Sequence, residues 1–265
     1  MAFRLFLITG CVLLAACSSP QEMEQKIAQQ SKSVAVAQAK TNGASDLKVE
    51  TDRMTFGYSY PKEAGSIAPL AAMLDADGKA IQAELERTTA AEQAQAAKGG
   101  FDYRPHSYEM TWKVVTDTPQ FLSLSGEFST YSGGAHGMYG VRSLVWDKRA
   151  GRSLDGAALF ASPAALDQAL GTKLCDALNA ERVKRRGAPL EEGGVEEFSR
   201  CISTAEATVL VGSSTGTALD RIGIWFGPYV AGSYAEGAYE LDFPVDGAVM
   251  RAVKPVYRTA FAPAG

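Results

Sequence analysis

Apolar and polar residues alternate in several short stretches of the chain, which is the pattern of strands with one buried face. The stretches are Met54–Tyr60 and residues 108–114, 122–131, 141–147, 208–211, 221–226 and 239–243. Asp117-Thr118-Pro119 joins two of them and predicts a tight antiparallel hairpin over residues 108–131. The neighbouring turns are short, so we expect mainly antiparallel pairing.

Two longer stretches carry apolar residues at helical spacing. The first has a face of Leu70, Leu74, Ile81 and Leu85 and should end near Lys98, before Gly99-Gly100. The second begins at Ser162-Pro163, a typical N-cap and first helical residue, and its stripe is Leu166, Leu170, Leu174 and Leu178. The predicted fold class is therefore α+β: a mixed, mainly antiparallel sheet or sheets packed against two main helices.

Residues 1–16 have the pattern of a lipoprotein signal peptide. A basic start precedes an apolar stretch, 5–15, which is too short to span a bilayer as a mature helix. Leu14-Ala15-Ala16-Cys17 resembles a bacterial lipobox, in which cleavage precedes the cysteine and Cys17 is lipidated. The alternative is an ordinary secretory signal that leaves a free cysteine. Ser18 favours sorting to the outer membrane, so the expected location is the periplasmic side of the cell envelope, with a lipid anchor in the membrane.

We expect the remaining chain to have three parts. Residues 17–46 are rich in Gln, Ala, Ser and Lys, and we expect them to form the lipidated cysteine and a flexible tether. Residues 47–131 should form an N-terminal α+β subdomain and residues 132–265 a C-terminal one. The net charge of −4, with no basic run that contains aromatic residues, argues against a nucleic-acid partner.

The cysteines are consistent with export. Cys11 lies in the predicted signal peptide and Cys17 is the predicted lipid site, which leaves Cys175 and Cys201 in the mature protein. An oxidising envelope favours a disulfide between them, and two unpaired buried thiols are the alternative.

The candidate chemistry is sparse. His106 and His136 are the two histidines, and no metal-ligand spacing is present, so we expect neither a metal site nor a cofactor. His136 lies in a glycine-rich loop and has three interpretations. It can tie the loop to the sheet, hydrogen-bond a ligand, or act as a general base on Ser132 in a hydrolase. The last role would need a nearby carboxylate and paired oxyanion donors.

Two motifs carry a family resemblance. Tyr131-Ser-Gly-Gly-Ala-His136-Gly is followed by a strand and Leu159-Phe160, and Phe226-Gly-Pro-Tyr-Val-Ala-Gly precedes Tyr-Glu-Leu-Asp-Phe-Pro. Together they resemble paired domains of unknown function in envelope proteins. These include the ectodomains of RsiV-like anti-sigma factors, which bind lysozyme, and the N-terminal, non-catalytic region of PdaC-like peptidoglycan deacetylases. The resemblance implies an α+β fold and a binding surface for lysozyme or cell-wall glycan.

By position, the resemblance makes two loops the candidate ligand contacts, with the residues Ser132, Gly133, Gly134, His136, Pro228, Tyr229 and Tyr234. No deacetylase domain with Asp and His metal ligands is present, so that activity does not carry over. The leading hypothesis is a non-enzymatic envelope lipoprotein that binds a lysozyme-type enzyme or peptidoglycan fragments. The alternatives are a hydrolase of cell-wall material that uses Ser132 and His136, and a structural module without a small ligand, in which the tyrosines would be buried.

Overall fold

The computed structural model describes residues 35–188 and 198–265, which belong to one compact unit. The predicted signal peptide, Cys17, residues 18–34 of the predicted tether and an acidic stretch at 191–197 lie outside the described residues. Within the described ranges, no helix is both long enough and apolar enough to cross a membrane.

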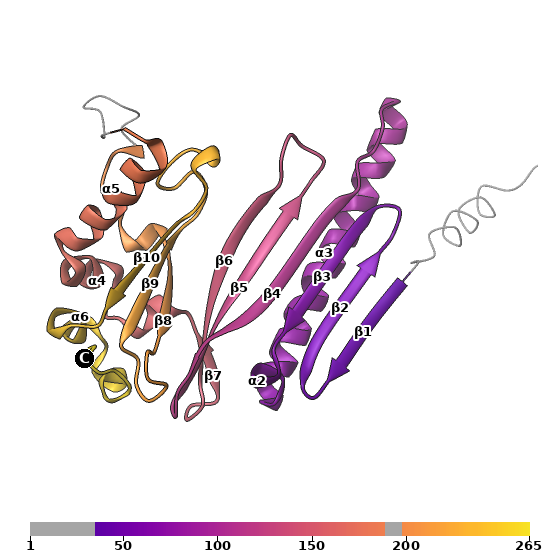
Figure 1. Cartoon of the computed structure of the whole chain (residues 1–265). Helices are drawn as coiled ribbons and strands as arrows, with labels where there is room; N and C mark the ends of the chain where they lie inside the picture. Colours follow the sequence, from indigo (N-terminus) through magenta and orange to yellow (C-terminus); the bar gives the residue numbers. More distant parts are fainter. Residues whose placement is uncertain (1–34, 189–197) are drawn as a thin grey trace, which may run out of the picture. The chain divides into compact units, whose positions relative to one another are not determined.

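A seven-stranded sheet occupies the first half of the described chain, and its strand order follows the sequence (Figure 1). Its strands are β1 (Ala35–Thr41), β2 (Ala44–Glu50), β3 (Met54–Tyr60), β4 (His106–Asp117), β5 (Phe121–Tyr131), β6 (Met138–Asp147) and β7 (Arg152–Leu154). All neighbours are antiparallel except β3 and β4, which are parallel with Met54 opposite His106. A parallel pair needs a long crossover, and the helices α2 (Lys62–Gly65) and α3 (Ala68–Gly99) provide it.

Helix α3 packs on one face of this sheet, against β3 and β4 (Figure 1). It buries Leu70 and Leu74 in the first hydrophobic core. Gly78 lies in the helix because a Cβ there would approach the Tyr58 ring to 3.0 Å. The Tyr58 hydroxyl donates to Asp77 Oδ2 (2.8 Å) and accepts a hydrogen bond from Trp112 Nε1 (2.9 Å). The buried polar groups between helix and sheet are thereby paired.

A three-stranded sheet with the order β10-β9-β8 forms the second half, with helices beside it (Figure 1). The strands are β8 (Thr208–Gly212), β9 (Arg221–Phe226) and β10 (Tyr239–Pro244). The α-helices are α4 (Pro163–Leu170), α5 (Thr172–Arg186) and α6 (Gly247–Ala252), and the short 3-10 helices are η1 (Gly156–Leu159), η3 (Thr204–Glu206), η4 (Tyr234–Glu236) and η5 (Pro255–Ala260). The second predicted helix is divided, because Gly171 adopts φ 56° and ψ −138° between α4 and α5.

Strands β5 and β6 contribute to both hydrophobic cores. Leu122 and Trp146, which pair across the strands, belong to the core under α3. The adjacent Phe121 and Val145 belong to the core of the second half. Successive side chains of a strand point to opposite faces, so this end of the sheet is buried on both sides.

The predicted fold class is confirmed, including the hairpin over residues 108–131 and the mainly antiparallel pairing. The tether prediction is wrong for residues 35–46, which lie in β1, the β1–β2 turn and the start of β2. The sequence of β1 lacks large apolar residues, so a strand held by backbone pairing left no periodic signal. The predicted subdomain boundary at 131/132 lies inside the β5–β6 hairpin, where the two strands share ten residue pairs.

Candidate functional site

The two loops selected from the sequence meet in the folded protein. His136, in the β5–β6 loop, stacks on Tyr234 of the β9–β10 loop with ring centroids 4.0 Å apart. The Tyr229 hydroxyl lies 3.4 Å from His136 Nε2, and the Tyr234 hydroxyl donates to the Gly137 carbonyl (2.8 Å). The structure therefore joins segments 93 residues apart into a single aromatic surface.

Tyr229 has half of its area open to solvent, and its backbone is unusual. Val230 N donates to the Gly227 carbonyl (3.1 Å), which closes a turn with Pro228 and Tyr229 at its centre. Tyr229 has φ +69°, a value that such a turn position normally reserves for glycine. A bulky residue there costs free energy, and such strain is concentrated at functional sites.

Tyr139, on β6, completes the surface and is not among the residues predicted from the sequence. Its ring meets Tyr234 edge-on at 6.4 Å, and its hydroxyl accepts a hydrogen bond from Ala238 N (3.0 Å). Residues two apart in a strand point to the same face. Tyr139 lies two residues before the half-buried Val141, so the strand pattern places both on one face of the sheet. We call His136, Tyr139, Tyr229 and Tyr234 the aromatic cluster.

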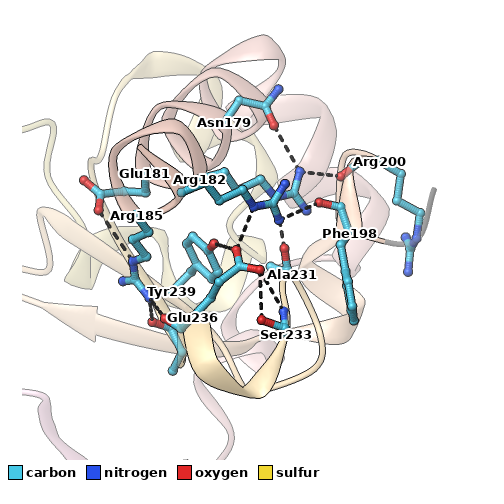
Figure 2. A network of polar contacts seen from close by, with 12 residues as sticks. Asn179, Glu181, Arg182, Arg185, Phe198, Arg200, Ala231, Ser233, Glu236 and Tyr239 are labelled. Carbon is cyan, nitrogen blue, oxygen red and sulfur yellow. Dashed lines mark hydrogen bonds and ion pairs between the residues drawn. The ribbon is translucent and has the colours of Figure 1, made fainter. Parts of the chain in front are cut away.

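Glu236 braces the β9–β10 loop from inside (Figure 2). Ser233 and Glu236 form a capping box at η4, and Arg186 Nε donates to Glu236 Oε2 (2.8 Å). The Tyr239 hydroxyl donates to the same carboxylate. Gly232 leaves room for it, because a Cβ at that position would lie 2.6 Å from a Glu236 oxygen.

The bracing contacts set the protonation of both partners. Burial alone would raise the pKa of Glu236, but hydrogen bonds from Tyr239, Arg186 and Ser233 outweigh it and lower the pKa from 4.5 to about 2. Burial, followed by the hydrogen bond to Glu236, raises the pKa of Tyr239 to about 12. Across the neutral pH range, Glu236 therefore stays ionised and Tyr239 stays protonated, as this hydrogen bond requires.

Arg182 supports the same loop from α5, and its side chain is fully buried (Figure 2). Its Nε donates to the Ala231 carbonyl (3.0 Å), and another nitrogen donates to the Arg200 carbonyl (2.8 Å). The Cys175–Cys201 disulfide, which confirms the predicted pairing, ties the segment that carries Arg200 to α5. Burial and, next, the nearby positive charge of Arg186 lower the pKa of Arg182.

We expect acid to weaken the contacts that hold this loop once the Glu236 carboxylate is protonated. A carboxyl whose folded pKa is depressed stabilises the protein above its unfolded value, and that contribution is lost as the pH falls from 4.5 through about 2. Glu236→Gln should therefore be less stable at neutral pH and should lose less stability on acidification. Thermal unfolding midpoints across this range measure both effects. Glu240→Gln, which changes an exposed carboxylate on β10, is the control, and equal acid slopes for wild type and Glu236→Gln would contradict the assignment.

The remaining predicted residues lie elsewhere in the two loops. Ser132 lines two cavities together with His106 and Glu92, whose side chains pair at 3.0 Å. The Gly133 carbonyl accepts a hydrogen bond from Arg104 (3.3 Å) and that of Gly134 from the Tyr131 hydroxyl (3.1 Å). Pro228 is buried beside Tyr229 in its turn. Of the seven candidates, His136, Tyr229 and Tyr234 form one surface.

The contacts of His136 differ from those that a hydrolase needs. Its Nδ1 lies 2.9 Å from the Gly137 carbonyl and its Nε2 faces Tyr229. Over residues 35–188 and 198–265, neither Ser132 nor a carboxylate is hydrogen-bonded to the ring. In the same ranges, no three His, Cys, Asp or Glu side chains are grouped as metal ligands.

Comparisons with known proteins agree with the motif resemblance. Residues 47–139 match the family model described as Deacetylase PdaC, a region that includes His136 and Tyr139. A DUF3298-family crystal structure from Bacteroides fragilis NCTC 9343 is similar at 14% identity and a TM-score of 0.51, covering 87% of this chain and 98% of that one. A second, from Pseudomonas aeruginosa PAO1, has 16% identity and a TM-score of 0.42 with the same coverage.

No curated protein gives a significant match. The family match includes the first of the two motifs, residues 131–137, whereas the second motif, which begins at Phe226, lies outside it. The chain thus resembles PdaC over residues 47–139 and shares the fold of the Bacteroides member of the DUF3298 family.

Proposed function

We propose that this protein is a non-enzymatic binding module of the bacterial cell envelope, which uses the aromatic cluster to bind a lysozyme-type enzyme or peptidoglycan fragments. The observation that carries the proposal is Tyr229, a half-exposed ring held at φ +69° and in contact with the loop of His136. The backbone conformation of Tyr229 costs free energy, and its exposed ring adds nothing to the hydrophobic core. This combination favours a role in binding a ligand.

The physical properties of the cluster suit recognition. Tyrosine presents a large apolar face and a polar hydroxyl, and it is enriched among the residues that dominate binding energies. The contacts of Glu236 and Arg182 fix the loop before a ligand arrives. A preformed surface loses less conformational entropy on binding, which favours affinity.

The motif resemblance, which includes peptidoglycan deacetylases, supports a cell-wall setting. The matched family model is described as a deacetylase, and the motif resemblance is to the non-catalytic region of such proteins. We therefore propose for this protein a location near the cell wall, and we do not propose deacetylase activity. An anchor at Cys17 on the periplasmic side of the outer membrane would place the module beside peptidoglycan and beside any lysozyme that enters the envelope.

A direct test uses the full chain, purified in mild detergent and immobilised, with a hen-type lysozyme and with purified peptidoglycan as separate probes. We expect saturable binding of at least one probe, and no release of soluble fragments from peptidoglycan. Absence of binding to both probes would sink the proposal. Fragment release that disappears in Ser132→Ala would replace it with the hydrolase alternative.

A further inference from the structure

A groove of about 620 Å³ adjoins the aromatic cluster. The exposed faces of β4, β5 and β6 form its floor, and residues of β9 and β10 form one wall. Tyr139 belongs both to the groove and to the cluster, so the two are continuous. The residues that determine its chemistry are Glu109, Lys113, Glu127, Tyr139, Trp225 and Glu240.

Strand register places the acidic groups of the groove. Glu109 on β4 lies opposite Ser129 on β5, which lies opposite Tyr139 on β6, so these three residues form a row across the floor. Glu240 on β10 lies opposite Trp225 on β9 in the other sheet. On the wall, a carboxylate therefore lies beside an aromatic ring, and on the floor Glu109 and Tyr139 lie in one row with Ser129 between them.

The charges of the groove do not cancel. Lys113 pairs with Glu127 at 2.5 Å. Glu109 and Glu240 form no ion pair with any residue in the described ranges. The groove therefore carries an excess of two negative charges between aromatic rings.

We infer that this groove receives basic side chains of a protein partner that the aromatic cluster binds, an inference that rests on the proposed function and selects a cationic protein over a neutral glycan. A guanidinium forms two parallel hydrogen bonds with a carboxylate and stacks on an aromatic face, and both kinds of group face this space. A cation near Tyr139 or Trp225 gains further from the ring quadrupole. A neutral sugar gains nothing from two unpaired carboxylates that it must desolvate.

The test compares the full chain with the Glu109→Gln/Glu240→Gln double variant, using a hen-type lysozyme as the cationic probe at low and moderate salt. We expect the double variant to bind at least about tenfold more weakly and to lose much of the salt dependence. Glu50→Gln/Glu86→Gln removes the same charge from exposed positions outside the groove and should bind as wild type. The substituted residues are exposed, and unchanged thermal unfolding confirms that both variants fold.

The possible results separate this inference from the proposed function. Equal lysozyme affinity of wild type and double variant would overturn the groove and leave the binding module intact. A second arm measures an oligoarginine peptide on Tyr234→Ala, in which the cluster is disrupted. Peptide binding that is lost when Glu109 and Glu240 are also replaced by Gln would support the groove, even if lysozyme fails to bind. Absence of peptide binding would overturn the groove.

Discussion

Tyr234→Ala should weaken binding of the recognised ligand by about tenfold or more, the effect expected at the centre of a binding surface. Tyr234 contacts every other member of the aromatic cluster: it stacks on His136, lies 5.6 Å from Tyr229 and meets Tyr139 edge-on. Its removal would also take one hydrogen-bond donor from the Gly137 carbonyl and so loosen the β5–β6 loop. Titration of the full-length variant against the probe that the wild type binds measures the loss.

Phe101→Ala is the matched control, because Phe101 is an exposed aromatic residue (61% exposed) outside the cluster. It should bind as wild type. If Tyr234→Ala keeps both its fold and its affinity, the cluster is a structural contact between loops and the proposed site is wrong.

Arg182→Met should lower the free energy of unfolding by about 3 kcal/mol, because it leaves buried carbonyl groups without their charged donor. Methionine is apolar and roughly replaces the side-chain volume, but it cannot donate to the carbonyls of Ala231 and Arg200. Urea unfolding of the full chain measures the loss. Lys184→Met on the same helix removes a positive charge from a side chain that is 75% exposed and should change stability little.

Arg182→Met also distinguishes residues that hold the loop in place from residues that touch the ligand. Arg182 lies under the loop and is fully buried, so it cannot touch a partner. Weaker binding by a folded Arg182→Met protein would show that loop rigidity contributes to affinity. A stability equal to that of Lys184→Met would contradict the role of the buried guanidinium.

The sequence predicted those elements whose local pattern agrees with their tertiary environment. Tyr239, Leu241 and Phe243 alternate in sequence and are buried in β10 as expected. Ser162 caps α4 through a hydrogen bond from Ala165 N, as the Ser-Pro pair indicated. The β1 strand escaped prediction because backbone pairing to β2 requires no apolar side chains.

The meeting of the two loops depended on long-range packing and could not be derived from spacing. The motif resemblance selected both loops, but their contact joins residues 97 positions apart. Of the contacts that hold the β9–β10 loop, one has a local sequence pattern, the Ser233-x-x-Glu236 capping box. Arg182 left none, since an arginine in a helix is ordinarily expected at the surface.

Hydrogen exchange on the full chain, with and without the probe that it binds, tests the central claim most directly. If the two loops form one binding surface, the ligand should slow exchange of backbone amides in both 132–139 and 227–238, with little change in α3. Protection confined to one loop, or located outside both, would contradict the account.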